Sequence, residues 1–592
     1  MLTKRHIDCD LCVIGGGLAG MSAAIAAARC GLRVVLMHER PMLGGNASSE
    51  IRMWICGAQG EDNRETGIPE EIALENLYRN PTKSFAVWDT VLYDFVHREK
   101  NITLLLNCTC MDASSHEGNF AHGRTRKIDS VTGYQMTTQT FIEVSAKFFC
   151  DSSGDSITAP LCKAEFKIGR EAASEYGELA SAKTADSKTM GMSCLIQGRE
   201  TSEKIDYIPP EWSAKLSDSD FENRMPDLGS DYENFWYLEL GGGRKTEESE
   251  NVRDELLSLA AGTWDYIKNS GNFNSANWDL DFLGFLPGKR ESRRMCGEYM
   301  ITQCDISDGV RFDDEIAYGG WPLDDHFPDG FYHRGVPNTN FTTPAPYSIP
   351  YRCLYSKNVD NLFFAGRNIS ATHMAMSSTR VMATCALLGE AVGTAAYLAC
   401  ENNLSPHGVY LDKIETLQDM LMDADCFLPN RHRKVSDACK NALLSGASDI
   451  IRNGEDRAHR IYKTTEETCA YAAENGKEIS YITSDVQPTH AHIVFCSDLN
   501  RRTLPVSDCE RMHSTRANKR LDSPQVHMPA TLCREFKLIG ERGGVRTELL
   551  HITENRRRSY HLPINETFDK LILIPISNWG GSEKTKIVSF DF

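Results

Sequence analysis

The chain opens on a short apolar run followed by a segment rich in alanine. Residues 10–14 form the run, and "LAGMSAAIAAARC" follows with the composition of a buried helix. A second apolar run, "RVVLM", comes directly afterwards. A strand, a glycine-rich turn, a helix and a second strand in this order predict a β-α-β unit at the N-terminus.

Similar apolar runs recur at intervals through the first two thirds of the chain. Residues 101–110 predict one buried strand, and residues 140–155 predict a hairpin arm and then a strand that ends in a glycine turn. Residues 361–368 predict a late strand with a similar turn, and residues 377–400 predict a helix of small residues. Both ends of residues 1–425 therefore carry the pattern of a nucleotide-binding fold.

The pattern is looser between residues 156 and 349. This region contains aromatic-rich pieces and one clear amphipathic helix, "VRDELLSLAAGTWDYI". The apolar residues that fall on one face of this helix are Leu256, Leu257, Ala260, Trp264 and Ile267. We expect an α+β domain here, inserted between the two nucleotide-type parts.

The character of the sequence changes again after residue 425. Residues 426–449 are polar and predict a linker, whereas residues 450–592 contain short strands separated by turns. Near the C-terminus, Val588, Phe590 and Phe592 alternate with polar residues, which is the period of a half-buried strand. This part predicts a separate all-β sandwich.

Composition narrows the class of protein. A chain of 592 residues needs several domains, and 41% hydrophobic with 25% charged residues is ordinary for a globular protein. The net charge of -18 disfavours nucleic acid or an anionic membrane as a partner. The sequence offers no signal peptide, no apolar run of membrane-spanning length and no metal-ligand pattern, and its cysteines are scattered through apolar runs. We therefore expect a cytoplasmic protein.

Three glycines follow the first strand with the spacing G-x-G-x-x-G. Gly15 is expected to make the turn, Gly17 to let the backbone approach a pyrophosphate, and Gly20 to let the helix pack on the sheet. Glu39 ends the second strand, 19 residues after Gly20, where a carboxylate accepts hydrogen bonds from a ribose diol. The unit therefore predicts a dinucleotide site.

Two further features favour FAD over NAD as the dinucleotide. The pair Gly44 and Gly45 lies just past the second strand, where the second half of a bound FAD extends across the sheet. The late turn at Gly366 precedes a helix whose positive N-terminus suits the flavin edge that becomes negative on reduction. A single FAD contacted by both ends of the region explains both features. Because only one G-x-G-x-x-G is present, a second NAD(P)H-binding domain is not expected.

Residues 1–425 resemble the FAD-dependent oxidoreductase family of the glutathione-reductase-type two-dinucleotide-fold superfamily. The motifs that carry this resemblance are "GGNASSEIRMWICGA", "PGKRESRRMCGEYMIT", "YGGWPLDD" and "AGRNISATHMAMSSTRVMATCALLGEAVGTAA". The resemblance implies an α/β Rossmann-type FAD-binding domain (residues 1–155 and 350–425) with an inserted α+β substrate domain (156–349). The last 140 residues resemble the galactose-binding-like sandwiches appended to some members. Many members are bacterial and lie among carbohydrate-degrading genes, which suggests bacterial origin and carbohydrate metabolism.

The candidate cofactor-binding residues combine these motifs. The late turn carries Arg367 where many FAD enzymes have an aspartate, so Arg367 can reach phosphate instead, while Asn368 or Asp155 serves the ribityl chain. The full set is Gly15, Gly17, Gly20, Glu39, Arg40, Gly44, Gly45, Asn46, Cys110, Ser153, Gly154, Asp155, Gly366, Arg367 and Val381.

The candidate catalytic residues are basic. His373 lies between the late turn and the next helix, so we expect it over the isoalloxazine, where a neutral histidine takes a hydroxyl proton; a helix cap is the alternative. Arg380, expected in the first turn of that helix, would offer charge to flavin or substrate. The remaining candidates are Arg290, Arg293, Arg52 and His326.

Three function classes are compatible with these residues. The favoured class is an FAD enzyme that moves a hydride between flavin N5 and a small polar molecule such as a sugar, sugar acid or polyol. The second class is an electron-transfer subunit, disfavoured because no iron–sulfur cysteine cluster is present, and the third is a binding or scaffold protein that keeps FAD as a structural relic, disfavoured by the intact arginine and histidine set. An FAD-binding protein that reduces an unsaturated carboxylate is a further alternative. The expected partners are a small-molecule substrate and an unidentified electron acceptor. A homo-oligomer is compatible with the sequence.

Overall fold

The computed structural model describes residues 2–229, 235–465, 467–483, 486–501 and 513–592. The chain forms two compact units. Unit 1 contains Met1–Ala58, Thr82–Ile414 and Met512–Gln525, and unit 2 contains Gln59–Pro81, Glu415–Arg511 and Val526–Phe592. Each unit therefore contains a segment that is distant in sequence from the rest of it.

The core of unit 1 is a mostly parallel sheet. Its strands run in the order β3-β2-β1-β6-β5-β4, and β18 pairs with β6. The pairs β1–β2, β2–β3, β1–β6 and β6–β18 are parallel, whereas β4 and β5 run antiparallel at one edge. The strands are β1 (Thr3–Ile14), β2 (Val34–Met37), β3 (Ile102–Leu105), β4 (Cys108–Glu117), β5 (Arg126–Gln135), β6 (Thr140–Asp151) and β18 (Leu362–Phe364).

Two sequence predictions for this region are wrong in the same way. The single strand expected over residues 101–110 is two strands, because Asn107 adopts a left-handed backbone with φ 54° and reverses the chain. The single helix expected over residues 377–400 is α8 (His373–Thr379) followed by α9 (Met382–Asn402). Both breaks lie inside apolar or small-residue runs, so periodicity does not reveal them.

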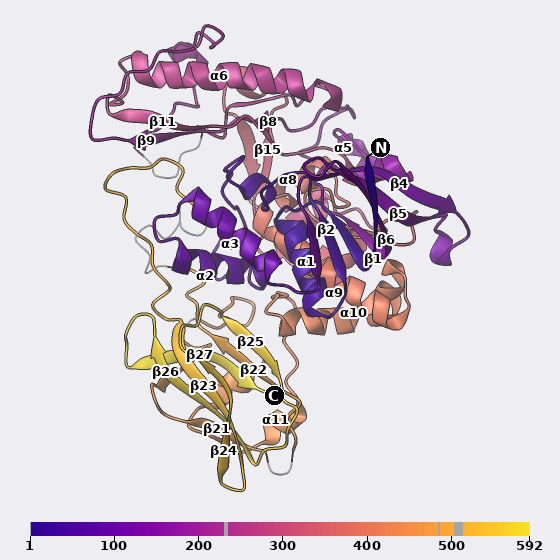
Figure 1. The fold of residues 1–592 in the computed structure, drawn as a ribbon, viewed down its shortest axis with the longest axis vertical. Coiled ribbons are helices and arrows are strands. Elements are labelled where there is room, and N and C mark those ends of the chain that lie inside the picture. The colour runs from indigo at the N-terminus through magenta and orange to yellow at the C-terminus, as the bar shows by residue number, and fades with distance from the viewer. Residues whose placement is uncertain (1, 230–234, 466, 484–485, 502–512) are drawn as a thin grey trace. The chain divides into compact units, whose positions relative to one another are not determined.

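Helix α9 packs closely against α1 (Leu18–Arg29) beside the sheet (Figure 1). A Cβ atom on Gly389 would lie 2.0 Å from the Ala19 carbonyl oxygen, so only glycine permits this approach. Contrary to the sequence prediction, α9 is long and apolar enough to cross a membrane by length and composition. Since 83% of its most apolar window is buried in the structure, α9 is a core helix.

The region inserted between β6 and β18 has a core of its own. Helix α6 (Ser249–Asn269) covers the antiparallel pair of β9 (Ile196–Glu200) and β11 (Trp278–Leu283), as Figure 1 shows. All five residues predicted on its apolar face are buried. The other helices and strands of unit 1 are α3 (Phe85–His97), α4 (Thr158–Cys162), β7 (Phe166–Lys167), α5 (Ala173–Tyr176), β8 (Met192–Ser193), β10 (Glu239–Leu240), β12 (Gly288–Lys289), β13 (Arg294–Met295), α7 (Gln303–Ser307), β14 (Glu315–Gly319), β15 (Leu323–His326), β16 (Asn338–Phe341) and β17 (Tyr347–Pro350).

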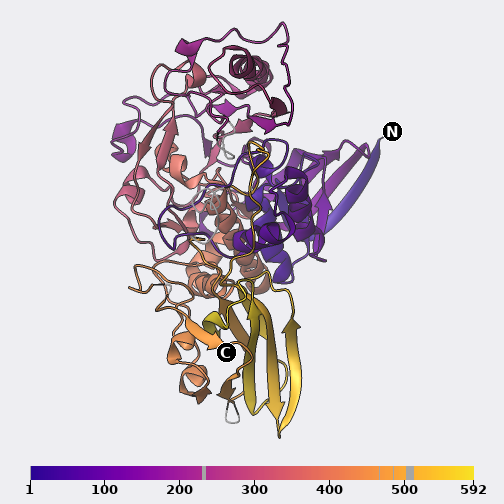
Figure 2. The same ribbon diagram turned by 90° about the vertical axis from the view of Figure 1, so that its left-hand side faces the viewer.

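Unit 2 is a sandwich of two antiparallel sheets, whose strands are the gold and yellow arrows of Figure 2. One sheet has the order β19-β21-β26-β23-β24 and the other β20-β27-β22-β25, and apolar residues from both form a common core. The strands are β19 (Leu444–Ser445), β20 (Tyr471–Glu474), β21 (Ile479–Ile482), β22 (His490–Phe495), β23 (Cys533–Arg542), β24 (Val545–Ile552), β25 (Ser559–Pro563), β26 (Lys570–Asn578) and β27 (Lys584–Asp591).

The borders of the sandwich differ from those expected. Residues 426–449, predicted as a linker, contain α11 (Asp437–Asn441) and β19, which pairs with β21 at a sheet edge. Helix α2 (Ile68–Arg79) also belongs to unit 2 and places Leu74 and Leu77 in the sandwich core. Helix α10 (Pro406–Asp423) connects the two units along the chain.

Candidate active site

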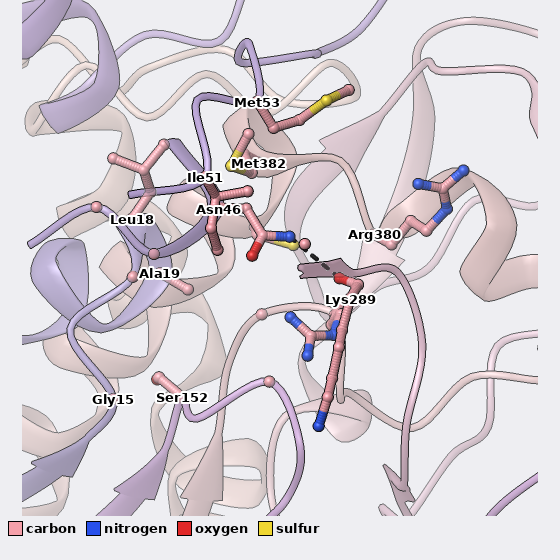
Figure 3. A pocket seen from close by; sticks show the side chains of 18 of the residues that line it. Gly15, Leu18, Ala19, Asn46, Ile51, Met53, Ser152, Lys289, Arg380 and Met382 are labelled. Carbon is pink, nitrogen blue, oxygen red and sulfur yellow. Dashed lines mark hydrogen bonds between the residues drawn. The ribbon is translucent and has the colours of Figure 1, made fainter. Parts of the chain in front are cut away.

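A pocket in unit 1 lies where the carboxyl ends of β1 and β6 meet the inserted region (Figure 3). It encloses about 1070 Å³ of empty space, part of it open to solvent. Parallel sheets bind their ligands at this end of their strands. Of the predicted cofactor-binding residues, those that line the pocket are Gly15, Gly17, Glu39, Arg40, Gly44, Gly45, Asn46, Ser153, Gly154, Gly366, Arg367 and Val381.

The first glycine turn has the geometry that its spacing predicts. Gly15 has a φ of 106°, and a Cβ atom there would lie 2.3 Å from the Ser152 carbonyl oxygen. A Cβ atom on Gly20 would lie 1.8 Å from the Gly15 oxygen, so Gly20 serves helix packing and does not line the pocket. Gly17 is the N-cap of α1 and has no side-chain cap, which leaves the helix N-terminus facing the pocket.

His38 supports this turn and was missed by the sequence analysis. The Gly16 N–H donates to His38 Nδ1 at 3.0 Å, and the other ring nitrogen lies 2.9 Å from the Met42 carbonyl oxygen. The ring is only 2% exposed. His38 directly precedes Glu39, so its ring fixes the end of β2 beside the glycine turn.

Glu39 and Arg40 line the pocket at the end of β2. Their side chains lie 3.7 Å apart, and Arg40 Nη1 also lies 3.6 Å from a carboxylate oxygen of Glu50. Within the described part of the chain, Arg40 Nε and Nη1 are buried without a hydrogen-bond partner. Glu39 and Arg40 therefore offer the pocket a carboxylate and cationic N–H groups, which suit a ribose diol and a phosphate.

The second glycine pair faces the first turn. The Gly44 N–H donates to the Gly16 carbonyl oxygen at 2.8 Å, and a Cβ atom on Gly45 would lie 3.1 Å from Gly17 Cα. Asn46 donates through Nδ2 to the Lys289 carbonyl oxygen at 3.1 Å, the dashed contact in Figure 3. Asn46 therefore ties this loop to the inserted region.

Asp155 positions two cations of the pocket and does not line it. Its carboxylate lies 2.7 Å from Arg367 and 2.8 Å from Lys289, both of which line the pocket. Burial alone would raise the pKa of Asp155, but Arg367 and Lys289 lower it below its usual range. A direct contact of Asp155 with the ribityl chain, as the sequence suggested, is therefore replaced by an indirect role. The sequence analysis missed Lys289.

Cys110 lies on β4 and does not line the pocket, contrary to expectation. Burial raises the pKa of its thiol to about 12, so it is an inert core residue. By contrast, Ser153, which lies two residues after the end of β6, does line the pocket. Its turn favours glycine at residue 154, where the backbone is left-handed with a φ of 74°.

Arg380 lies at the break between α8 and α9. It is the C-cap of α8, not a residue in the first turn of α9 as expected, and Val381 is the N-cap of α9. Arg380 Nη2 donates to Asp324 Oδ2 at 3.0 Å, while its buried Nε has no hydrogen-bond partner in the described part of the chain. The N-terminus of α9 reaches the pocket through Val381 and Met382.

A buried network joins Arg380 to Arg290, another of the four arginines among the described residues that line the pocket. Arg290 lies 3.0 Å from Glu239, and Glu239 lies 2.9 Å from His326 Nδ1. His326 Nε2 then lies 3.3 Å from the same Asp324 oxygen that Arg380 contacts. Burial alone would raise the pKa of Glu239, but Arg290 and His326 lower it. His326 is therefore linked through carboxylates to Arg290 and Arg380 without lining the pocket itself.

His373 does not have the position or the charge expected of a neutral base. It does not line the pocket and is only 2% exposed. Its Nδ1 lies 2.9 Å from Glu291, and its Nε2 lies 3.0 Å from Asp325. Burial alone would lower its pKa, but Glu291 and Asp325 raise it to about 10. The ring is therefore a cation between two carboxylates that holds the start of α8.

Arg52 and Arg293 are also outside the pocket lining. Arg52 Nη1 lies 2.9 Å from Gln197 Oε1 and 3.1 Å from Asp281 Oδ2, which ties the loop after the second glycine pair to the inserted region. Arg293 donates to the Asp155 carbonyl oxygen at 3.1 Å. Both arginines link loops within unit 1.

Residues 10–421 match the FAD dependent oxidoreductase family, which is 70% of the chain. The chain belongs to the FAD-dependent oxidoreductase family. The enzyme therefore uses FAD, and the matched residues contain the glycine turn, the inserted region and the four arginines that line the pocket. The pocket fits this cofactor: two helix N-termini, the Glu39 carboxylate and the Arg40 guanidinium line it, and Arg40 Nε and Nη1 have no hydrogen-bond partner among the described residues.

Two curated proteins show similarity over a short region. Sarcosine oxidase subunit alpha of Corynebacterium sp. (strain U-96) is 38% identical over 89 residues, 14% of this chain and 9% of that protein. The tRNA uridine 5-carboxymethylaminomethyl modification enzyme MnmG of Protochlamydia amoebophila is 36% identical over 98 residues, 15% of each chain. This chain thus matches less than a sixth of either relative.

Solved structures with similarity cover both parts of the chain at low identity. p-Nitrophenol 4-monooxygenase PnpA of Pseudomonas putida DLL-E4 is 11% identical over 70% of this chain and 86% of its own, with a TM-score of 0.31. The family 32 carbohydrate-binding module of Streptococcus pneumoniae EndoD is 7% identical over 26% of this chain and 94% of its own, with a TM-score of 0.17.

Proposed function

We propose that this FAD-dependent oxidoreductase moves a hydride between the flavin and a small polar metabolite that carries hydroxyl groups. A sugar, a sugar acid or a polyol is the favoured class. The observation that carries the proposal is the polar wall formed by Arg290 and Arg380 in the pocket. When bound, FAD supplies the centre that accepts or gives the hydride.

The charges of this wall are largely compensated. Arg290 is paired with Glu239 and Arg380 with Asp324, while Ser193 adds a hydroxyl group that accepts from Arg290 at 2.8 Å. A compensated wall with many fixed hydrogen-bonding groups suits a ligand with several hydroxyl groups or one carboxylate better than a highly charged anion. This argument supports a sugar-like or sugar-acid ligand.

His326 takes the place of His373 as the candidate for handling the hydroxyl proton. It contacts Glu239 and Asp324, and these carboxylates contact two of the pocket arginines. A positioned acid–base group contributes about 10²–10⁴-fold to a rate. Both histidines are paired with carboxylates at both ring nitrogens, and His326 is preferred because its two carboxylates in turn contact Arg290 and Arg380, which line the pocket.

The test is anaerobic loss of the visible flavin band when the purified holoenzyme is mixed with candidate substrates. A panel of aldoses, aldonic and uronic acids and polyols should contain a compound that reduces the flavin, whereas N-methyl amino acids should not. Arg290→Gln should slow this reduction at least tenfold without loss of FAD. The matched control is Arg199→Gln on the exposed side of β9. Reduction by amines alone would contradict the substrate class.

The alternative function, reduction of an unsaturated carboxylate, is tested by starting from reduced flavin and recording its oxidation. Chemically reduced holoenzyme is mixed with fumarate-like acids, and return of the oxidised flavin band is recorded. Rapid return with these acids, combined with no reduction by any sugar or polyol, would favour that alternative.

The proposal also covers the location of the protein and its electron acceptor. We propose a cytoplasmic location, supported by free thiols at all cysteines of the described residues. We also propose that a separate electron acceptor reoxidises the flavin. A homo-oligomeric state stays a sequence prediction, to be measured by sedimentation.

A further inference from the structure

A segment from the C-terminal part of the sequence completes unit 1 beside the pocket. Residues 513–525, called the strap below, lie between two parts of the sandwich in sequence but belong to unit 1. The Glu200 N–H donates to the Lys519 carbonyl oxygen at 2.7 Å, and the Lys519 N–H donates to the Gly198 oxygen at 3.0 Å. The strap is therefore hydrogen-bonded along β9.

Side chains of the strap extend this contact to the loop after the second glycine pair. Lys519 Nζ lies 2.9 Å from Asp281 Oδ2, the same oxygen that Arg52 contacts at 3.1 Å. The ring of His513 lies against the indole of Trp54, with centroids 4.6 Å apart and planes tilted by 37°. The strap thus contacts Trp54 directly and is linked to Arg52 through the shared Asp281 carboxylate.

Trp54 itself lines the pocket. Its Nε1 is buried and has no hydrogen-bond acceptor among the residues that the structure describes. Buried indole N–H groups normally find an acceptor, so this donor indicates a partner supplied by a ligand. Two residues further on, the Cys56 carbonyl oxygen accepts from Ala383 in the first turn of α9 at 3.0 Å. The loop that carries Trp54 is therefore tied to the start of α9, whose N-terminal residues Val381 and Met382 line the pocket.

We propose that Trp54 is a cofactor-binding residue whose indole N–H donates to an oxygen of the flavin half of FAD, and that the strap holds the indole in place. The isoalloxazine carbonyls and the ribityl hydroxyls supply oxygens of the required kind. The inference rests on FAD as the cofactor and is independent of the substrate class, so its test needs no substrate.

The experiment measures FAD and ADP binding to apoprotein prepared from the full chain. ADP carries the adenosine and pyrophosphate parts of FAD but no flavin. Trp54→Phe should raise the Kd for FAD about three- to tenfold, the effect of one hydrogen bond, and should shift the visible flavin spectrum. Its Kd for ADP should be unchanged. Glu39→Ala should raise both constants, because it acts on the adenosine half.

The strap is tested by His513→Ala and Lys519→Ala, which should raise the Kd for FAD in the same direction without affecting ADP binding. Trp212→Phe and Lys215→Ala, at exposed sites, are the matched controls and should bind both ligands normally. Circular dichroism establishes that each variant is folded. A folded Trp54→Phe protein with the wild-type Kd for FAD and the wild-type flavin spectrum would overturn the proposal. Equal weakening of FAD and ADP would also overturn it, since the effect would not be specific to the flavin half.

Discussion

At the scale of residues, the sequence predicted the backbone of the site better than its charged side chains. Gly15 and Gly20 are dictated by contacts that leave no room for a Cβ atom, Gly45 is favoured by its left-handed φ of 60°, and such turns have a fixed spacing. By contrast, His373 and Arg52 were assigned by their distance from these turns. Their partners come from remote segments, and no local pattern shows that a carboxylate will neutralise them.

Glu39 provides the most direct test of the adenosine end of the pocket. Glu39→Ala removes the carboxylate expected to accept hydrogen bonds from the ribose diol, each worth about 1.5–3 kcal/mol when charge-assisted. The Kd for FAD should rise roughly tenfold or more, measured by flavin fluorescence on dilution. Glu401→Ala, an exposed site at the end of α9, is the control and should bind FAD normally. Wild-type occupancy of Glu39→Ala after extensive dialysis would refute the assignment.

The ion pairs of His373 predict a pH dependence of stability. Its pKa is raised from 6.5 to about 10, so its protonated form stabilises the fold fully below pH 6.5, and this contribution is lost as the pH rises towards 10. His373→Gln should therefore be less stable than wild type by about 3–5 kcal/mol near pH 6. The difference in Tm between the two proteins should shrink towards pH 10.

The control for this prediction is His432→Gln, because His432 is largely exposed. Its Tm difference from wild type should be small at every pH. A His373→Gln difference that stays constant from pH 6 to pH 10 would show that the histidine contributes shape and not charge.

At the scale of elements, alternation and apolar runs located the strands and helices but not their breaks. The chain reverses at Asn107 through one left-handed residue, and it bends at Arg380 between two helices of small residues. In both places hydrophobicity continues across the break. The bend at Arg380 has consequences for the site, since it brings a helix N-terminus and a guanidinium group to the same end of the pocket.

The contact between α1 and α9 predicts the effect of a single methyl group. A Cβ atom on Gly393 would lie 2.3 Å from the Ala23 carbonyl oxygen and 2.9 Å from Ala26 Cβ, so Gly393→Ala must push the helices apart. The expected loss is about 1–3 kcal/mol in the free energy of unfolding, measured by urea denaturation of the holoenzyme. Glu401→Ala on the same helix serves as control. An unchanged free energy of unfolding for Gly393→Ala would mean that α1 and α9 can move apart without loss of stability.

At the scale of the whole molecule, the sequence predicted the succession of a flavin region and a sandwich but not the exchange of segments between the two units. Residues 59–81 look like part of the N-terminal region and residues 512–525 like part of the C-terminal one. Each nevertheless belongs to the other unit. Such exchange depends on tertiary contacts and has no compositional signature.

The exchange changes what a truncated chain should do. A protein that ends at Pro429 lacks the strap, and its Trp54 loses the ring of His513. Its Kd for FAD should rise at least threefold, measured by titration of soluble apoprotein. The control is the full chain with Leu443→Ser at an exposed site of unit 2, which should bind FAD normally. A soluble truncated protein with the wild-type Kd would show that the strap is dispensable.

The exchange of segments between the two units also determines when each unit can complete its fold during protein synthesis. Ribosomes release the N-terminal end first, and domains generally fold as units while the chain emerges. Residues 59–81 must wait for the sandwich strands that follow residue 415, and the flavin region must wait for the strap near residue 520. Neither unit can reach its final form until nearly the whole chain has been made. The gene therefore cannot be cut between its two apparent modules and recombined with others, because each half encodes a piece of its neighbour's structure.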